Sequence, residues 1–301
     1  MILVTGISGA LGSLIFDGLS ARGDLEVVGG TRRGDGTGRR RIDFDDPATL
    51  VDGFAGADVL VFVSAGYAED DVVLARHGAA ADAAAAAGVR HVVYTSLASS
   101  GDLMSIALAH RWTEARLAAA PFDVTVLRNG LYAEVPAGLA AAGAVSAAST
   151  GVFAAALGTG KVSVVAREDL ADVATRVAAD IDNDLAAGRR SRHAGQAYEL
   201  EGITAIGGDD IADMISSALD RPIEYRAVSL AQARQDLAGS GLEPYQLAHT
   251  ISLFSNVGAG LLEATSTDLT TLLTSEPRPV REAVVEVVKA GGYQSQSIAT
   301  K

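Results

Sequence analysis

The sequence predicts an α/β protein: a Rossmann-type, doubly wound parallel sheet with a smaller, mainly helical C-terminal substrate domain. Apolar, β-rich runs alternate with alanine-rich helical stretches over the first half of the chain, which is the pattern of βαβ units. Several of these runs are apolar throughout, as expected of parallel strands that helices cover on both faces. A glycine-rich turn directly follows the first run and leads into the first helix. Together these observations favour the doubly wound arrangement.

The expected elements follow from these runs in chain order. We expect strands over residues 2–4, 25–30, 41–44, 58–63, 91–95 and 124–127, and helices over residues 11–22, 70–87 and 108–119. Gly23 and Gly88 stand where glycine commonly ends a helix. After Asn129 the alternation weakens, and we expect strands over residues 162–165 and 197–200 and helices over residues 169–180, 209–219 and 280–289. Residues 34–41 are polar and glycine-rich, which predicts an exposed loop after the second strand.

The chain is expected to divide into two parts. Residues 1–135 form the expected NADP-binding Rossmann domain, to which a strand near 196–202 returns, and residues 136–195 and 203–301 form the expected substrate-binding part. The long uncharged run between Glu134 and Lys161 is mostly Ala, Gly, Ser and Thr, with Pro136 near its start. It has too few large apolar side chains for a membrane span, so we expect a mobile surface loop with a short helix. We further expect residues 136–160 to be a wall of the substrate site that ligand binding orders.

The composition excludes several classes of protein. The 301-residue chain has no cysteine, which excludes disulfides, zinc–thiolate sites and cysteine nucleophiles. Its 37 acidic and 24 basic residues give a net charge of −13, which opposes binding to nucleic acid or to an anionic membrane. The amino terminus lacks the basic region and cleavage site of an export signal, so the expected location is cytoplasmic. The histidines show no paired metal-ligand spacing, and we predict no metal site.

Gly6, Gly9 and Gly12 mark a predicted binding site for a dinucleotide. They stand between the first strand and the first helix of a βαβ unit, the context that such a motif needs. Glycine allows a sharp turn and lets a pyrophosphate approach the backbone amides at the positive end of the helix. We expect the whole turn to contact the cofactor: Gly6, Ile7, Ser8, Gly9, Ala10, Leu11 and Gly12.

Arg32 indicates which dinucleotide binds. NAD-binding enzymes place an acidic residue at the end of the second strand to hold the ribose hydroxyls, whereas this chain has Arg32 and Arg33 there. A guanidinium can hold a 2′-phosphate through two parallel hydrogen bonds, so the expected cofactor is NADPH. Asp43 either contacts the adenine amino group or caps the end of the third strand, and residues 39–41, all arginine, either add to the positive field or are only solvated. The expected cofactor contacts also include Phe44, Val63, Ser64, Ala65 and Thr95.

Several short motifs resemble those of one known family. They are the TGxxGxxG turn, Thr31-Arg32, YTSL at residues 94–97, LRNGLY at residues 127–132, GTGK at residues 158–161 and REDLA at residues 167–171. The family is the NmrA-like group of atypical short-chain dehydrogenase/reductases, within which the chain is most similar to bacterial NADPH-dependent quinone oxidoreductases, with triphenylmethane dye reductases close by. The resemblance covers nearly the whole chain and is strongest over residues 1–172. Its motifs are specific for the family but not for a substrate.

The wider superfamily uses a Tyr-x-x-x-Lys pair, in which the ammonium lowers the pKa of the phenol so that it can exchange a proton with a carbonyl substrate. This chain lacks the pair, because no tyrosine stands four residues before any lysine: Lys161, Lys289 and Lys301. His110 and Glu114 stand at that spacing in the corresponding helix, a departure that other NmrA-like proteins share. The departure argues against alcohol dehydrogenation, epimerisation and dehydration, each of which needs a strong positioned acid or base.

Hydride transfer to a quinone needs less help, because the product is an aromatic hydroquinone anion that water or a weak acid can protonate. His110, with an ordinary pKa of about 6.5, is either that acid or a surface or cofactor-contacting residue with no proton to transfer. Ser96 matches the serine of the ordinary reductase triad, and we expect its hydroxyl to bond cofactor or substrate. Tyr67, Asn129 and Tyr132 follow strand ends, where ligands of such sheets bind. Tyr132 is either a stacking wall for a flat substrate or a core residue.

The sequence therefore predicts an NADPH-dependent reductase of a quinone or a similar planar, electron-poor substrate, acting as a monomer or a homodimer. Two alternatives stay open. The first alternative is a non-catalytic NADP(H)-binding redox sensor of the NmrA type. The second is a tailoring reductase of aromatic polyketide biosynthesis. The missing Tyr-x-x-x-Lys pair fits the sensor as well as the enzyme, whereas the tyrosines at the strand ends favour the enzyme.

Overall fold

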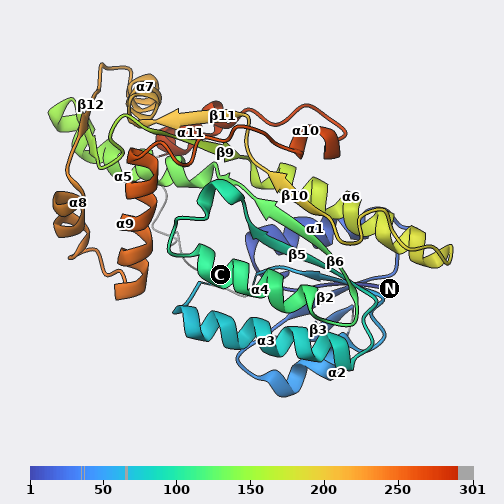
Figure 1. Ribbon diagram of the computed structural model, residues 1–301. Coiled ribbons are helices and arrows are strands. Elements are labelled where there is room, and N and C mark those ends of the chain that lie inside the picture. Colours follow the sequence, from blue (N-terminus) through green and yellow to red (C-terminus); the bar gives the residue numbers. More distant parts are fainter. Residues whose placement is uncertain (35, 37, 65–66, 291–301) are drawn as a thin grey trace.

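Seven strands form the central sheet of the computed structural model, which describes residues 1–34, 36, 38–64 and 67–290 (Figure 1). The strand order is β10-β6-β5-β4-β1-β2-β3, and every neighbouring pair is parallel. The order reverses between β1 and β4, and doubly wound sheets bind ligands at this point. The strands are β1 (Ile2–Val4), β2 (Val27–Thr31), β3 (Arg39–Arg41), β4 (Val59–Phe62), β5 (His91–Leu97), β6 (Asp123–Asn129) and β10 (Ala197–Leu200).

Helices cover both faces of this sheet (Figure 1). α1 (Ala10–Ser20) and α6 (Arg167–Ala186) pack against one face, where they share an apolar cluster with β1 and β4. α2 (Leu50–Phe54), α3 (Asp70–Ala86) and α4 (Ala107–Ala118) pack against the other face around a second cluster. Burial on both faces explains why the strands are apolar throughout. The range 136–195, expected to bind substrate, therefore contains a helix, α6, that packs on the central sheet.

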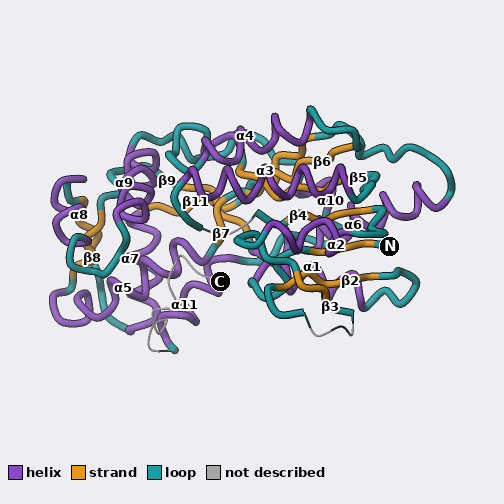
Figure 2. Tube along the Cα trace, turned by 90° about the horizontal axis from the view of Figure 1, so that it is seen from below, coloured by secondary structure: helices purple, strands orange, loops and turns teal. Residues whose placement is uncertain are grey.

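Most of the other elements surround a third apolar cluster, which includes Leu97 at the end of β5 and Met104 just after it. Leu269 and Leu272 instead belong to the cluster that α1 and α6 share. Figure 2 shows most of these other elements at one end of the molecule, with the central sheet at the other. A three-stranded sheet has the order β11-β9-β7, and β12 pairs with β8. No helix in the described residues is long and apolar enough to cross a membrane. The elements are β7 (Leu131–Tyr132), α5 (Glu134–Thr150), β8 (Val152–Ala155), β9 (Lys161–Val165), β11 (Thr204–Gly207), α7 (Gly208–Leu219), β12 (Glu224–Ala227), α8 (Leu230–Leu237), α9 (Pro244–Gly258), α10 (Leu269–Leu272) and α11 (Val280–Lys289), with short 3₁₀ turns at Pro47–Thr49 and Ser99–Gly101.

The sheet confirms the predicted fold class, but the third strand was placed wrongly. We expected a loop over residues 34–41 and a strand over residues 41–44, whereas β3 spans Arg39–Arg41 and pairs with β2. The Arg40 guanidinium donates to the carbonyl oxygens of Gly53 at 3.1 Å and Ala55 at 2.6 Å, which ties this edge strand to α2. A run of arginines suits an edge strand, because charged side chains there discourage pairing with another chain.

The expectation of a surface loop with only a short helix between Glu134 and Lys161 is also wrong, because most of this run forms α5 and β8. That residues 136–160 form a wall of the substrate site stays a prediction. α5 is a regular helix of 17 residues, and the left-handed Gly151, with φ of 73°, ends it. Its alanines pack closely against neighbouring elements, so Ala140 and Ala147 are fully buried. A Cβ on Gly143 would lie 2.6 Å from the Phe153 ring of β8, which shows how near the helix approaches this strand. Small side chains here permit close packing, and the absence of large ones does not indicate disorder.

Ala140→Leu is expected to destabilise the protein by about 1–3 kcal/mol, because the buried helix face has no room for three more carbon atoms. Ala142→Leu, on the exposed face of the same helix, is the matched control and should change the free energy of unfolding by less than about 0.5 kcal/mol. Urea unfolding of both variants measures the difference. Equal stability of the two variants would mean that α5 does not pack as described.

Candidate active site

The turn between β1 and α1 has the shape of an anion-binding site. Gly6 has a φ of +65°, a left-handed conformation that favours glycine. A Cβ on Gly12 would lie 2.3 Å from the Gly6 carbonyl oxygen, so the start of the helix packs directly on the turn. Gly9 is the N-cap of α1, and no side chain caps the helix there. Its first amides are therefore available to a phosphate group.

Arg32 and Arg33 lie just beyond β2, next to this turn. Both side chains are exposed, and neither forms an ion pair or a hydrogen bond with the described part of the chain. Gly29 lets the turn approach β2, because a Cβ there would lie 2.3 Å from Cδ1 of Ile7. The two guanidinium groups are thus free to bind a phosphate beside the glycine turn.

Asp43 and Phe44 follow β3 and have structural contacts. Asp43 Oδ1 accepts a hydrogen bond from the Asp45 amide at 3.1 Å, which is the contact of a capping carboxylate and agrees with the second interpretation of this residue. The Phe44 ring packs on Phe62 with centroids 5.6 Å apart. Both residues are partly exposed.

Two buried threonines fix the backbone where β4 ends. The Val63 amide donates to Thr5 Oγ1 at 3.0 Å, and the Ser64 amide donates to Thr95 Oγ1 at 3.0 Å. These bonds join the ends of β1, β4 and β5, so the expected cofactor contacts Val63, Ser64 and Thr95 lie along one edge of the sheet. Ala65, the remaining expected contact, lies outside the described residues.

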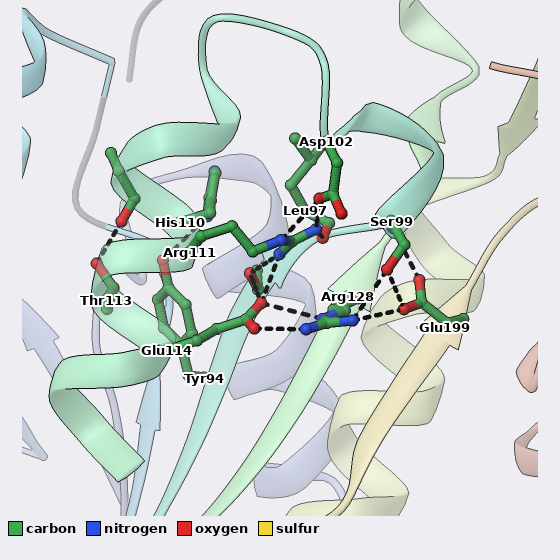
Figure 3. Close-up of polar contacts among 12 residues, drawn as sticks. Tyr94, Leu97, Ser99, Asp102, His110, Arg111, Thr113, Glu114, Arg128 and Glu199 are labelled. Atoms are coloured by element: carbon green, nitrogen blue, oxygen red, sulfur yellow. Dashed lines mark hydrogen bonds and ion pairs between the residues drawn. The ribbon is translucent and has the colours of Figure 1, made fainter. Parts of the chain in front are cut away.

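A cluster of charged side chains surrounds Glu114 on α4 (Figure 3). Its Oε1 accepts from Arg111 at 2.6 Å and from Ser96 at 2.6 Å, and its Oε2 accepts from Arg128 at 2.7 Å. Arg128 also donates to Glu199 of β10 at 2.9 Å. We call Ser96, Arg111, Glu114, Arg128 and Glu199 the Glu114 network. It connects α4 to three neighbouring strands of the central sheet.

The Glu114 network holds its carboxylate in the charged form. Burial by itself would raise the pKa of Glu114, but hydrogen bonds from Arg128 and Ser96 and the charges of Arg111 and Arg128 outweigh it and lower the pKa. The same balance lowers the pKa of Glu199, through Ser99 and Arg128. Ser96 donates its proton to Glu114, so the structure places this hydroxyl in an internal hydrogen bond, where we expected a bond to cofactor or substrate.

His110 faces Tyr94, one helical turn before Glu114 (Figure 3). A hydrogen bond of 2.9 Å joins His110 Nδ1 and the Tyr94 hydroxyl. Burial, with the nearby Arg111 charge, lowers the pKa of His110 to about 4. The imidazole is therefore uncharged at neutral pH, which corrects the expectation of a weak acid with an ordinary pKa.

Asn129 and Tyr132 lie near the end of β6 in different surroundings. The Asn129 side chain is buried, and its Oδ1 has no hydrogen-bond partner within the described residues, which leaves an unsatisfied acceptor at this edge of the sheet. Tyr132 is covered, because the Arg167 guanidinium lies 4.9 Å from its ring centroid and pairs with Glu134 at 2.7 Å. Tyr132 is partly buried beside the cluster that α1 and α6 share, and both interpretations of this residue stay predictions.

The expected site residues are thus divided between ligand-facing and structural positions. The glycine turn, the end of β4, Thr95 and Asn129 lie along the carboxyl edge of the sheet, with Arg32 at the end of β2. Tyr67 lies beyond β4 and is 36% exposed. Ser96 and Tyr132 bond to or pack against other residues of the chain. A dinucleotide along this edge would meet backbone amides and two arginines, Arg32 and Arg33, that have no partner among the described residues.

The chain has curated relatives among oxidoreductases. It is 31% identical over 270 residues to quinone oxidoreductase 2 of Escherichia coli (strain K12), an alignment that covers 86% of this chain and 88% of the relative. The chain belongs to the NmrA-like group of atypical short-chain dehydrogenase/reductases. An NmrA-like family domain-containing oxidoreductase of Aspergillus flavus is 30% identical over 147 residues, covering 44% of this chain and 48% of the relative. The NAD(P)H azoreductase of Xenophilus azovorans is 29% identical over 214 residues, covering 70% and 68%. No family model matches the chain.

Solved structures of NmrA-like and related reductases share the fold. The NADPH-dependent quinone oxidoreductase 2 of Escherichia coli, complexed with NADPH, superposes with a TM-score of 0.81 at 27% identity, covering 95% of this chain and 99% of that one. The Citrobacter sp. triphenylmethane reductase, complexed with NADP(H), gives a TM-score of 0.82 at 24% identity, covering 96% and 100%. At 24% identity, the similarity to the triphenylmethane reductase supports the fold alone.

Sequence reasoning about this NmrA-like chain noted Glu114 only through its spacing from His110 and missed the partners of Glu114. Arg128 and Glu199 each stand in a strand of the central sheet. A charged side chain in a covered strand must be paired, because an unpaired charge away from water is costly. That rule singles out Arg128 from the sequence but not Glu199, because β10 is an edge strand and Glu199 is partly exposed.

Glu114→Gln is expected to destabilise the fold by about 2–3 kcal/mol at neutral pH, because Arg111 and Arg128 lose the carboxylate that they share. The folded-state pKa of Glu114 lies below its unfolded value, so its stabilisation is complete above the unfolded pKa and is lost as pH falls through the folded pKa. The difference in unfolding free energy between wild type and variant should be constant above about pH 5 and shrink at lower pH.

Urea unfolding at several pH values measures this difference. Glu286→Gln is the matched control, since its ion pair with Lys289 is exposed and should contribute less than about 0.5 kcal/mol. A difference between wild type and Glu114→Gln that persists unchanged under acid conditions would show that the network does not act through the ionised carboxylate.

Proposed function

We propose that the protein is an NADPH-dependent reductase that transfers hydride to a quinone or a similar planar, electron-poor compound. The observation that carries the proposal is the protonation and pairing of two side chains on α4. An uncharged His110 and an ion-paired Glu114 stand at the Tyr-x-x-x-Lys spacing, so the helix offers no strong acid or base. Reduction of a quinone suits such a site, because the aromatic product drives the reaction. The names of the curated relatives, which include a quinone oxidoreductase, support the same class of substrate.

The residues present fit an NADPH cofactor. The uncapped start of α1 and the close approach at Gly12 suit the pyrophosphate. Arg32, which has no partner among the residues that the structure describes, suits the 2′-phosphate. The buried, unpartnered Asn129 Oδ1 can accept a hydrogen bond from the cofactor or the substrate. When bound, the dinucleotide supplies the hydride. The protein contributes a fixed edge of the sheet, made rigid by the bonds of Thr5 and Thr95, on which both reactants are positioned.

Steady-state oxidation of NADPH with a panel of quinones, azo dyes and activated enones tests the proposal. We expect turnover of quinones with a measurable saturation by substrate. Tight NADPH binding without turnover of any compound would overturn the proposal and favour a redox sensor that binds the cofactor without using it. The panel also includes aromatic polyketide quinones, and turnover of these compounds alone would support the tailoring reductase.

Arg32→Ala is expected to weaken NADPH binding by about 1.5 to 3 kcal/mol, or about ten- to a hundredfold, and to leave NADH binding nearly unchanged. The reason is the loss of a charge-assisted hydrogen bond to the 2′-phosphate, which NADH lacks. Calorimetric titration with both cofactors measures the effect. Arg90→Ala, at the opposite end of β5, is the matched control. Equal affinity of the wild type for both cofactors would contradict the assignment.

His110→Ala is expected to lower quinone turnover by less than about tenfold, because a general acid normally contributes a hundredfold or more and this imidazole is not charged. The lowered pKa means that the imidazole is protonated only in acid, so the turnover number should show no histidine inflection from about pH 5.5 to about pH 8.5. The pH profiles of wild type and variant test this. A loss above about a hundredfold at unchanged NADPH affinity would restore His110 as the proton donor.

A further inference from the structure

Three aromatic rings meet where α9 lies against the segments that follow β4 and β5. Tyr67 comes from the segment after β4, and Tyr245 and His249 come from successive turns of α9. The Tyr67 ring centroid lies 5.4 Å from that of Tyr245 and 5.4 Å from that of His249, and the latter two are 6.0 Å apart. We call these three residues the aromatic cluster. Two of them lie more than 100 residues from any motif of the predicted cofactor site.

α9 holds the aromatic cluster against the segments that follow β4 and β5. The Tyr245 hydroxyl donates to the Tyr67 carbonyl oxygen at 3.3 Å, and His249 Nδ1 lies 2.6 Å from Ser105 Oγ, just before α4. The Ser105 amide donates to Ser252 Oγ at 3.0 Å. Figures 1 and 2 both show α9 beside the start of α4. The cluster therefore lies where segments leaving the carboxyl edge of the sheet meet the C-terminal helices.

The rings are available to a ligand. Tyr67 is 36% exposed, and Tyr245 and His249 are partly exposed. Burial lowers the pKa of His249, although Asp70 and Glu69 oppose the effect, so its ring is an uncharged aromatic surface at neutral pH. Tyr132 differs, because Arg167 covers its ring.

We propose that Tyr67, Tyr245 and His249 form a stacking surface that selects flat substrates with several fused rings. The proposal rests on the proposed function, since it names the substrate class of the same site. Aromatic rings favour offset or edge-to-face contacts over a few ångströms, and exposed rings grouped together offer more such contact to a wide substrate than to a narrow one. A single-ring quinone gains little from this surface, whereas each fused ring extends the contact.

The same cluster has a second interpretation, in which Tyr245 has only a structural role and holds α9 in place through the hydrogen bond from its hydroxyl to the Tyr67 carbonyl oxygen. Two substitutions distinguish the stacking role from the structural role. Tyr245→Phe removes the donor to the Tyr67 carbonyl oxygen but keeps the ring, and Tyr245→Leu removes both. Trp112→Leu is the matched control, because it removes an exposed ring, 40% accessible, that packs over Gly78 on the surface of α3 and α4.

The experiment measures KM and kcat for benzoquinone, naphthoquinone and phenanthrenequinone, with one, two and three fused rings. Tyr245→Leu should raise KM about three- to tenfold for the widest quinone and less than about twofold for benzoquinone, with kcat changed less than KM. Tyr245→Phe and Trp112→Leu should stay within about twofold of wild type for all three. Equal damage by Tyr245→Phe and Tyr245→Leu, or an effect of Tyr245→Leu that does not depend on ring number, would overturn the proposal.

A binding measurement separates this proposal from the proposed function. Acridine has three fused rings and no quinone oxygens, so its fluorescence titration into the NADP⁺-loaded protein reports stacking without turnover. Tyr245→Leu should weaken acridine binding about three- to tenfold, and Tyr245→Phe should not. If no quinone is reduced and acridine binding still responds in this way, the stacking surface stands and the reductase proposal fails. If quinones are reduced and acridine binds all variants equally, the stacking surface fails.

Discussion

The shared carboxylate of Glu114 holds together the half of the molecule that carries the site. It joins α4 to β5 through Ser96 and to β6 through Arg128, and Arg128 continues to Glu199 on β10. The Glu199 backbone in turn exchanges hydrogen bonds with Asp268, which brings the C-terminal part of the chain to the sheet edge. Charges taken out of water stabilise a fold only when every one of them is paired, so the network fixes one arrangement of these elements.

This arrangement determines what chemistry α4 can perform. Glu114 fixes the register of the helix, and the register places His110 against the Tyr94 hydroxyl in a partly buried position. A carboxylate held by two guanidinium groups is a poor base, and an uncharged imidazole is a poor acid. The residues that make the helix rigid are therefore the ones that acid–base catalysis would need. The site can still position the reactants, but it has no side chain suited to proton transfer. This combination suits a substrate that is easily reduced.

Local sequence patterns predicted the central sheet and the glycine turn, because strands covered on both faces and tight turns restrict their own residues. The length of α5, where only a short helix was expected, was underestimated for a different reason. Its alanines are buried only because Phe153, α7 and α11 pack against them, and these partners are distant or unrecognised in the sequence. The Glu114 network was missed on the same ground, since Arg128 and Glu199 are 71 positions apart. Pairings of this kind depend on the completed fold.

The distribution of charge explains how an acidic protein can hold an anionic cofactor. The net charge of −13 creates a field that disfavours polyanions approaching from solution. At physiological salt, however, exposed charges are screened over about 8 Å, so a bound phosphate responds mainly to its immediate neighbours. Near the glycine turn those neighbours are the uncapped start of α1 and Arg32 and Arg33, which have no partner in the described part of the chain. The carboxylates of the Glu114 network are neutralised by their own arginines and add little repulsion there. Binding of a phosphate at this edge is therefore a local property, independent of the sign of the whole chain.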